Sequence, residues 1–449
     1  MNTLSIGFLM AFAMTSAMAA NTPIRYHRSN LFVKMKAGQT MIKSPLISSS
    51  KRLIGDLYLV KSDDLNALSH ELNNAENVEF IERDQFAGKK ALPKHESLQV
   101  NALLKAMIAP LAIQDTFNDP QVKNLWAFSA KNGMDVLGAY ATLPAGNPRQ
   151  VIVAVVDTGV DHNHDDLKDV MWTNPREIPK NGIDDDKNGY IDDIHGINTL
   201  VRDENGKATM NTQASHWHGT HVAGTIAASQ NNGKGIAGVA SNARIMAIRT
   251  VPDEADELDS DVVEAYIYAA KNGAKVINCS FGKEKNEGGM AVRDVMTEIG
   301  KKFGVLLVVS AGNDSDGPDI WHNNDVQPKY PASYDSPNMI VIASTTIGGE
   351  LSGFSNIGPT TVDIASPGSD ILSTMPKNRY APASGTSMAA PNLSGVAAMV
   401  IGYNPSLKAA GVKQILMASV VKVPAFEGKM LSGGRVNLKQ ALQMARRVR

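Results

Sequence analysis

Three short motifs supply the side chains from which a serine nucleophile and its base are built. They are Val-Asp-Thr-Gly at residues 156–159, His-Gly-Thr-His-Val-Ala-Gly at 218–224 and Gly-Thr-Ser-Met-Ala-Ala-Pro at 385–391. A serine hydroxyl is a poor nucleophile at neutral pH, so it needs a base that takes its proton and a carboxylate that orients the base. Ser387, His218 and Asp157 are the candidates for these roles.

The elements predicted around the motifs place these side chains at one edge of a sheet. Residues 151–156 are all apolar, which predicts a buried parallel strand that ends at Asp157. Open α/β sheets bind ligands beyond the carboxyl ends of their strands. His218 and Ser387 each open a stretch rich in Ala and Gly that predicts a helix packed closely on the sheet.

Two groups are predicted to stabilise an oxyanion. The first is the backbone N–H of Ser387, because a helix N-terminus carries unpaired N–H groups and partial positive charge. The second is Asn313, which directly follows the strand-like run 305–312. Its amide is therefore expected at the same sheet edge as Asp157.

The motifs resemble the subtilase family, the subtilisin-type serine endopeptidases. In that type the triad follows the order Asp, His, Ser along the chain. Further matching segments lie at residues 278–282, 310–313, 330–332, 354–356 and 365–368. Residues 392–393 are Asn-Leu where many relatives have His-Val, and this departure lies a turn beyond Ser387.

The resemblance implies a protein or peptide substrate bound in an extended conformation. Ser280, Phe281 and Gly282 match an exposed strand segment that pairs with such a substrate by β-augmentation. Two other interpretations stay open. A dedicated processing protease for one co-exported precursor shares every motif, and a non-catalytic binding protein on the same scaffold keeps the fold.

Each motif taken alone has a structural explanation. A lone Asp at a strand end is usually a turn residue, a lone His a buried structural group, and a Ser after Gly-Thr a helix cap. The order of the three motifs and the elements on which they lie favour catalysis.

Composition narrows the class of protein further. A chain of 449 residues with 43% hydrophobic side chains can bury a large core. The formal net charge is −1, with both signs mixed along the chain, so there is no electrostatic basis for binding nucleic acid or an anionic membrane. We expect a monomer without a membrane anchor.

The N-terminus predicts export to the periplasm or the extracellular space. Residues 4–20 are apolar and end in small residues, which indicates a signal peptide over residues 1–20, although no Lys or Arg precedes the apolar run. Cys279 is the only cysteine, so no internal disulfide can form, and a buried inert thiol is predicted. Structural calcium is the expected substitute for disulfides.

The first predicted calcium site lies in an insertion ahead of His218. Its candidate ligands are Asp184, Asp186 and Asn188, with Asp192 or Asp193 closing the site. The first three alternate as ligands do in the first half of an EF-hand loop, but the position of the closing glutamate holds a histidine. The alternative is an Asx-rich surface turn without an ion.

A second calcium site is implied by the resemblance alone. Asp166 and Asn232 match positions that ligate a structural calcium in related enzymes. The acidic run 253–261 is instead predicted as an exposed loop that caps a helix over residues 262–272. His216, His218 and His221 are not assigned to zinc, because a catalytic base cannot also be a ligand.

A separate module precedes the catalytic part. Residues 31–36, 57–60 and 78–82 are predicted as strands, and residues 63–73 as a helix capped by Asp63 or Asp64. The pattern resembles the inhibitor-like propeptide of subtilases, a small α+β domain that assists folding and blocks the active site until it is cleaved. Residues 21–86 are assigned to this domain, 87–117 to a linker with the processing bond, and 118–449 to the catalytic domain.

The predicted fold of the catalytic domain is α/β, with a doubly wound, mostly parallel sheet. Apolar runs at 245–251, 275–280, 305–311 and 339–344 alternate with helical stretches such as 262–272 and 291–303. Alternating strands and helices are typical of parallel sheets with right-handed crossovers.

Overall fold

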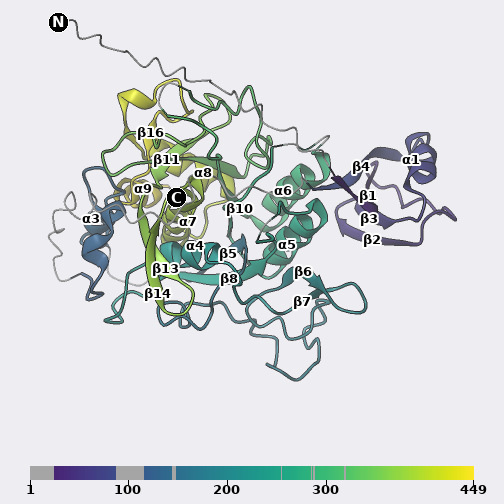
Figure 1. The fold of residues 1–449 in the computed structure, drawn as a ribbon, viewed down its shortest axis with the longest axis horizontal. Coiled ribbons are helices and arrows are strands. Elements are labelled where there is room, and N and C mark those ends of the chain that lie inside the picture. The colour runs from purple at the N-terminus through teal and green to yellow at the C-terminus, as the bar shows by residue number, and fades with distance from the viewer. Residues whose placement is uncertain are drawn as a thin grey trace, which may run out of the picture.

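The chain forms a small N-terminal domain and a larger α/β domain (Figure 1). The computed structural model describes residues 25–86, 116–143, 148–253, 255–284, 286, 289–317 and 320–448. The predicted signal peptide and most of the predicted linker lie outside the described residues.

The N-terminal domain is an antiparallel sheet with one helix packed on it. Its elements are β1 (Arg25–Met35), β2 (Ser49–Ile54), β3 (Leu57–Lys61), α1 (Leu65–Asn73) and β4 (Val78–Phe86), with strand order β2-β3-β1-β4. Asp64 caps α1, because its carboxylate accepts a hydrogen bond from the N–H of Ala67 at 2.9 Å. The sequence does not indicate β2, since only Ile54 of this strand is buried and apolar alternation is missing.

The larger domain is built on a ten-stranded sheet in the order β15-β16-β12-β11-β10-β9-β5-β8-β6-β7. These strands are β5 (Val151–Asp157), β6 (Asn198–Arg202), β7 (Ala208–Thr209), β8 (Ala243–Arg249), β9 (Val276–Cys279), β10 (Leu306–Ser310), β11 (Met339–Thr345), β12 (Ile364–Pro367), β15 (Val421–Lys422) and β16 (Gly434–Arg435). Only the outer pairs β6–β7 and β15–β16 are antiparallel. The mostly parallel sheet is therefore confirmed.

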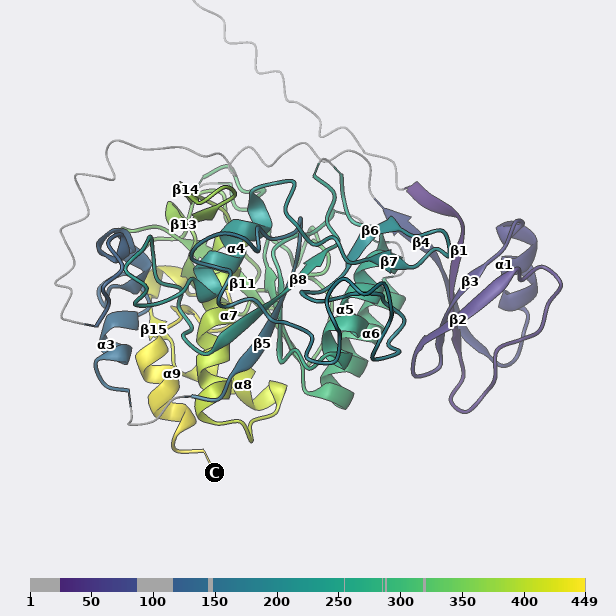
Figure 2. The same ribbon diagram turned by 90° about the horizontal axis from the view of Figure 1, so that it is seen from below.

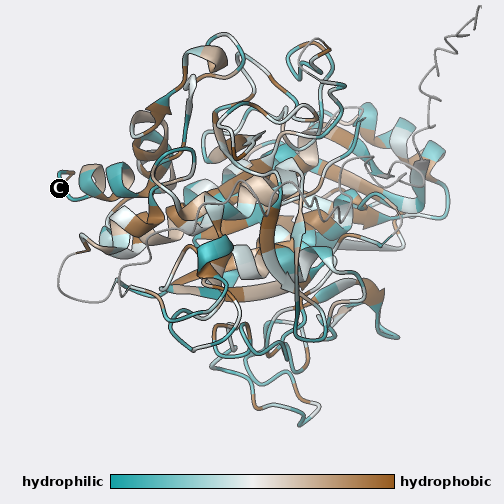
Figure 3. Ribbon diagram, turned by 60° about the vertical axis from the view of Figure 1, so that its left-hand side comes forward, coloured by the Kyte–Doolittle hydropathy of each residue, from teal (hydrophilic) through white to brown (hydrophobic). Residues whose placement is uncertain are grey.

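Helices cover both faces of this sheet (Figure 2). They are α3 (Val136–Tyr140), α4 (His218–Ala227), α7 (Thr386–Tyr403), α8 (Ala409–Ala418) and α9 (Leu438–Ala445) on one face, and α5 (Asp259–Lys271) and α6 (Met290–Phe303) on the other. Successive residues of β5 point to the two faces: Val153 and Val155 pack with the first group, and Ala154 and Val156 with the second. Figure 3 shows the hydrophobic strands at the centre, as burial on both faces requires.

One acidic segment differs from its prediction. The run 253–261 is expected to be an exposed loop, but α5 begins at Asp259, and Asp259 and Asp261 are both buried. Each carboxylate forms an ion pair with a cation from a distant segment, Asp259 with Lys283 and Asp261 with Arg202. Such pairing is not visible in the local sequence.

No helix in the described ranges is both long enough and apolar enough to cross a membrane.

Strand β5 lies at the switch point of the sheet, between β8 and β9. After β5 the chain forms β6 and β7 at one edge of the sheet, returns to β8 beside β5, and then crosses to β9 on the other side of β5. At such a point the loops leave the carboxyl ends of neighbouring strands in opposite directions, and a crevice opens between them. The last residue of β5 is Asp157.

Gly196 allows the chain that enters β6 to pass close to β8. Its φ angle is 134°, and a Cβ atom at this position would lie 1.9 Å from the carbonyl oxygen of Ala247. Neither the backbone conformation nor the space accommodates a side chain.

Gly196→Ala is expected to destabilise the larger domain by about 3 kcal/mol, because strain at positive φ adds to a clash with backbone. Urea unfolding followed by tryptophan fluorescence measures this. Gly206→Ala is the matched control, since Gly206 has a φ of 73° but no atom within 4 Å of the added Cβ, and it should cost about 1 kcal/mol. Equal midpoints for the two variants would show that the contact with Ala247 relaxes without cost.

Candidate active site

The carboxylate of Asp157 contacts the imidazole of His218. Asp157 is 1% exposed and ends β5, where its backbone carbonyl accepts hydrogen bonds from the N–H groups of Thr250 and Val251. Its Oδ1 lies 2.8 Å from His218 Nδ1 and also accepts from the N–H of Thr158 at 2.8 Å. Because an ionised carboxylate only accepts, this contact fixes the proton of the neutral imidazole on Nδ1 and makes Nε2 the basic nitrogen.

Helix α4 can place His218 there because the next residue is Gly219. A Cβ atom on Gly219 would lie 2.2 Å from the carbonyl oxygen of Gly159 and 3.1 Å from Asp157 Oδ1. Any larger residue would therefore push the start of α4 away from the end of β5.

Ser387 lies in the first turn of α7, which begins at Thr386 directly after Gly385. Its Oγ donates to the carbonyl oxygen of Ser280 at 3.2 Å, and Ser280 Oγ donates to the Ser387 carbonyl at 2.9 Å. Helices α4 and α7 pack against each other in one apolar core. The N-terminal ends of both helices therefore lie at the carboxyl edge of the sheet, with Asp157.

Asn313 is held against the same helix end. Its Oδ1 accepts hydrogen bonds from the N–H and the Oγ1 of Thr386, at 2.8 Å and 2.9 Å. Thr386 Oγ1 in turn accepts from the N–H of Gly312 at 3.1 Å. Since the amide oxygen is fixed on Thr386, the Nδ2 donors of Asn313 lie on the opposite side of the amide. The structure thus gathers all four predicted residues at one edge.

His221 has a structural role that the sequence motif does not reveal. It is fully buried one turn after His218, and its Nε2 donates to the carbonyl oxygens of Ile371 and Ala381 at 2.9 Å and 3.2 Å. Burial lowers the pKa of His221 to about 3, so it is neutral. It ties α4 to the hairpin of β13 (Ile371–Met375) and β14 (Arg379–Ala383).

The prediction that Ser280, Phe281 and Gly282 form an exposed strand is wrong. Strand β9 ends at Cys279, and Ser280 and Phe281 are only 4% and 5% exposed. The side chain of Phe281 packs into the apolar core with α5 and α6, and Ser280 is bound to Asn278 and Ser387. The pairing of this segment with a substrate stays a prediction.

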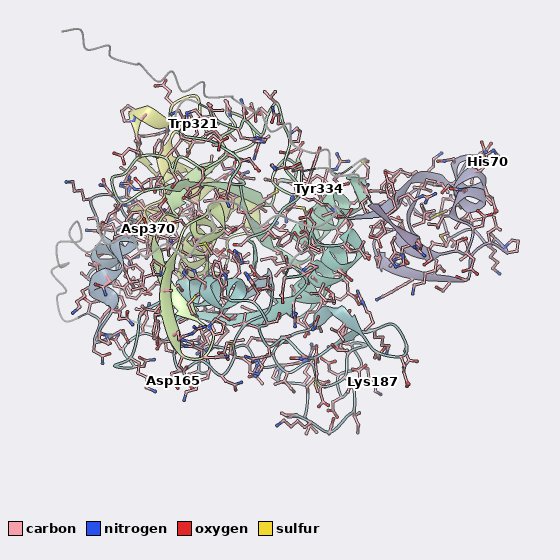
Figure 4. All side chains as sticks on the ribbon, in the orientation of Figure 1. His70, Asp165, Lys187, Trp321, Tyr334 and Asp370 are labelled. Carbon is pink, nitrogen blue, oxygen red and sulfur yellow. The ribbon has the colours of Figure 1, made fainter. Side chains whose placement is uncertain are left out.

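In the insertion, Glu177 joins two of the four predicted calcium ligands. Single carboxylate oxygens of Glu177, Asp184 and Asp186 all lie within 4.8 Å of one another. Asp192 is not part of this group, and its carboxylate accepts from the N–H groups of residues 181 and 182. Asn188 donates its side-chain amide to Asp193. Figure 4 marks the insertion by Lys187, at the edge of the larger domain.

Glu177 was missed because it lies seven residues before the Asp-rich run. Its two oxygens accept from the N–H groups of Asp186 and Asp192, both at 3.0 Å, so the run folds back on it. The only sign of Glu177 in the sequence is that an acidic residue precedes the Asp-rich run. Its contact with the run arises only when the loop closes.

The other pair of predicted ligands is in direct contact. Asp166 is fully buried, and its Oδ1 accepts from Asn232 Nδ2 at 2.8 Å, while its Oδ2 accepts from the hydroxyl of Tyr380 at 2.8 Å. Asp119 was missed by the sequence: it accepts from the N–H groups of Asn231 and Asn232, and burial raises its pKa. Two buried carboxylates and one amide therefore surround this loop.

The N-terminal domain docks on the starts of α5 and α6. Glu82 Oε2 accepts from the N–H groups of Met290 and Ala291 at 2.9 Å and 2.8 Å, and Asp84 Oδ1 accepts from the N–H of Ser260 at 2.9 Å. Both carboxylates thus lie at the positive ends of helices. Burial nevertheless raises the pKa of Glu82 to about 7. In Figure 4, Tyr334 lies beside this junction.

The switch point of this parallel α/β sheet thus carries a hydroxyl, an imidazole and a carboxylate. These are the groups that a serine hydrolase uses. A profile described as the Subtilase family matches residues 148–440. The chain therefore belongs to the subtilase family.

Named relatives are proteases from bacteria and from malaria parasites. An "Extracellular protease" of Xanthomonas campestris pv. campestris is 30% identical over 445 residues, covering 92% of this chain and 72% of that protein. The "Major intracellular serine protease" of Bacillus subtilis is 36% identical over 258 residues, covering 57% of this chain and 69% of that protein. "Subtilisin-like protease 1" of Plasmodium falciparum is 32% identical over 348 residues, or 73% of this chain.

The chain spans about half the length of several of the curated relatives it matches, 48% in the Plasmodium falciparum protein. Among solved structures, a protease of Pseudoalteromonas arctica aligns with a TM-score of 0.59 and 25% identity, covering 74% of this chain and 99% of that chain. The subtilisin-like α/β fold is thus shown for the larger domain.

Cys279 is a buried thiol, as predicted. It is fully buried at the end of β9, 3.2 Å from the hydroxyl of Tyr266, and burial raises its pKa to about 12. A thiol in this setting is not ionised near neutral pH.

We expect that Cys279 does not react with a thiol reagent such as DTNB at pH 8 in the folded protein, and that it reacts once per chain in denaturant. Ser406→Cys is the control, because residue 406 is exposed just after α7 and its thiol should react at once in the folded protein. Rapid labelling of the unchanged protein would contradict the burial of Cys279.

Proposed function

We propose that the protein is an exported, calcium-stabilised serine endopeptidase that is made as a self-processed precursor. The observation that carries this proposal is the 2.8 Å contact between His218 Nδ1 and Asp157 Oδ1 at the sheet edge where α7 begins with Thr386 and Ser387. Membership of the subtilase family and the names of the relatives support it.

In the proposed reaction Ser387 Oγ attacks the carbonyl carbon of a peptide bond. His218 Nε2 takes the hydroxyl proton and later gives it to the leaving amine. Asp157 holds the imidazole in the tautomer with the proton on Nδ1 and stabilises the imidazolium that forms. Water then repeats the attack on the acyl group bound to Ser387, with His218 again as the base.

The oxyanion of each tetrahedral intermediate is stabilised by the backbone N–H of Ser387 and by Asn313 Nδ2. The N–H lies in the first turn of α7, at the positive end of the helix dipole. The two bonds that Asn313 Oδ1 accepts from Thr386 hold the amide in place before substrate arrives. Loss of one such donor costs about 10²–10³ in turnover, a magnitude known from a subtilisin.

Two groups of oxygen ligands suit calcium by their chemistry. Carboxylate and amide oxygens are the ligands that Ca²⁺ prefers. Single carboxylate oxygens of Glu177, Asp184 and Asp186 lie within 4.8 Å of one another, and like charges at this distance repel. Arg176 pairs with Asp186 at 2.9 Å, and a bound cation would offset the rest of the negative charge. Asp166 and Asn232, with Asp119 beside them, form the second group. A bound ion would supply the structural crosslinks that the chain cannot obtain from disulfides.

The N-terminal domain is proposed to be an intramolecular inhibitor. Its sheet buries Phe32 and Leu57 in the same apolar cluster as Tyr266 of α5 and Val292 of α6. Glu82 and Asp84 cap the same two helices. The two domains therefore share a core that contains Phe281, next to the carbonyl group that Ser387 contacts.

Export is proposed from the apolar N-terminal segment, and the extracellular relative agrees with it. Protein and peptide substrates are proposed for the site, with residues 280–282 beside the extended chain.

Wild-type precursor is expected to lose its N-terminal domain during expression, and Ser387→Ala is expected to stay uncleaved, because only Ser387 can attack the processing bond. N-terminal sequencing of the products measures this. Hydrolysis of denatured casein should fall about 10⁴-fold or more in Ser387→Ala. Ser406→Ala, on an exposed residue, should behave as wild type. A serine-directed fluorophosphonate that labels wild type and Ser387→Ala equally would refute the assignment.

Calcium binding is expected at both groups of ligands. Equilibrium dialysis of wild type should give two ions per chain, and Asp184→Asn with Asp186→Asn should give one, because the first group then keeps a single carboxylate. Asp166→Asn should also give one. Asp335→Asn, on an exposed carboxylate, is the control and should keep both. An unchanged number of ions in the double variant would remove the insertion from the calcium sites.

A further inference from the structure

A buried ion pair lies where the last strand of the N-terminal domain reaches the larger domain. Lys283 Nζ lies 2.5 Å from Asp259 Oδ1, and each side chain is only 3% exposed. Burying two charges gains little over an apolar pair of similar size unless further hydrogen bonds satisfy them. The remaining partners of this pair are therefore informative.

Asp259 Oδ2 accepts from Asn286 Nδ2 at 3.5 Å. Two further partners are the backbone groups of one residue, Gln85. Lys283 Nζ donates to the carbonyl oxygen of Gln85 at 3.4 Å, and the N–H of Gln85 donates to the Asp259 carboxylate. Gln85, which is only 1% exposed, is therefore held through its backbone.

The position of Lys283 is fixed by the neighbouring chain. Its N–H donates to the carbonyl oxygen of Tyr330 at 2.8 Å, and its own carbonyl accepts from the N–H of Tyr330 at 2.9 Å. The backbone of Lys283 is thus bound to Tyr330, and only its side chain extends to Gln85. A small cavity adjoins the pair, with Phe281 and Tyr334 in its wall.

The pair also lies close in sequence to Ser280, the residue whose carbonyl group contacts the proposed nucleophile. The carbonyl of Ser280, three residues before Lys283, accepts the hydrogen bond from Ser387 Oγ. Three residues of extended chain span roughly 10 Å. An extended peptide cleaved at Ser387 would therefore reach the pair with about its fourth residue from the cleaved bond.

We propose that Lys283 and Asp259 form a backbone clamp for an extended polypeptide. In the structure strand β4 occupies the clamp through Gln85, and a protein substrate occupies it, N-terminal to the cleaved bond, after the N-terminal domain has left. The clamp rests on the proposed endopeptidase function. It requires a backbone N–H, and it therefore excludes proline.

The substrate side of the clamp is tested with peptides of two lengths, having two or six residues before the cleaved bond. The enzyme is the self-processed product of the full chain. In Asp259→Leu with Lys283→Met, which removes both members of the ion pair, kcat/KM should fall about 10-fold for the long peptide, mainly through KM, and stay unchanged for the short one. Lys271→Met, an exposed lysine of α5, is the control. An equal effect on both peptides, or none, overturns the substrate role.

N-methylation of the long peptide identifies the bound residue. With wild type, kcat/KM for the long peptide should fall to the value for the short peptide when the methyl group lies near the fourth residue from the cleaved bond. With the double variant, N-methylation should leave kcat/KM unchanged. A wild-type enzyme that tolerates N-methyl groups at every position from the third to the fifth residue contradicts the clamp.

The N-terminal side is tested without activity. In a full-length Ser387→Ala chain, the amide of Gln85 should exchange hydrogen at least ten times faster when Asp259→Leu and Lys283→Met are added, while amides of the α1 helix keep their rates. Unchanged exchange at Gln85 overturns this contact. If wild type hydrolyses neither peptide, the proposed function and the substrate role both fail, and the exchange measurement still decides the contact with Gln85.

Discussion

The close approach of helix α4 to the end of strand β5 is the constraint on which the site depends. Asp157 and His218 are separated by a long insertion, and they meet because a glycine follows the histidine and leaves room for the carbonyl of Gly159. The parallel sheet contributes the rest. Its strands end at one edge, so the loop after β10 brings Asn313 to the same place as the start of α7. Packing of α4 against α7 in a common apolar core keeps the N-terminal ends of the two helices together.

The two domains are joined by an interface that is apolar at its centre and charged near the site. Phe32 and Leu57 continue the core of the larger domain outward past α5 and α6. Towards the site, carboxylates of β4 meet helix N-termini, and the buried Lys283 lies among them. Several carboxylates share few cations there, and burial raises the pKa of Glu82, Asp84 and Asp259. The charged part of the interface thus contributes more to the specific placement of the two domains than to the strength of their association.

The insertion is held together mainly by hydrogen bonds among its own polar groups, and it makes few apolar contacts. Asp184 accepts from the N–H groups of residues 188 and 189, and Glu177 accepts from those of residues 186 and 192. Each of these acidic side chains therefore has partners in the loop, and single carboxylate oxygens of Glu177, Asp184 and Asp186 lie within 4.8 Å of one another. A loop with this arrangement has a defined shape but carries excess negative charge, which explains why a divalent cation suits it.

The sequence by itself determined the fold class, the main strands and helices, and the four residues of the site edge, because apolar runs, helix starts and short motifs are local patterns. It also placed a helix cap at Asp63 or Asp64, of which the structure uses Asp64, and it placed Cys279 in the core. Only the tertiary structure decided which distant groups meet: Glu177 with Asp184 and Asp186, Asp119 beside Asp166, and Lys283 with Asp259. It also buried Phe281 and the start of α5, where exposure was expected. The physical reason is that an acidic or polar residue looks solvent-exposed in a local pattern, and its burial depends on a partner that loop closure brings from far along the chain.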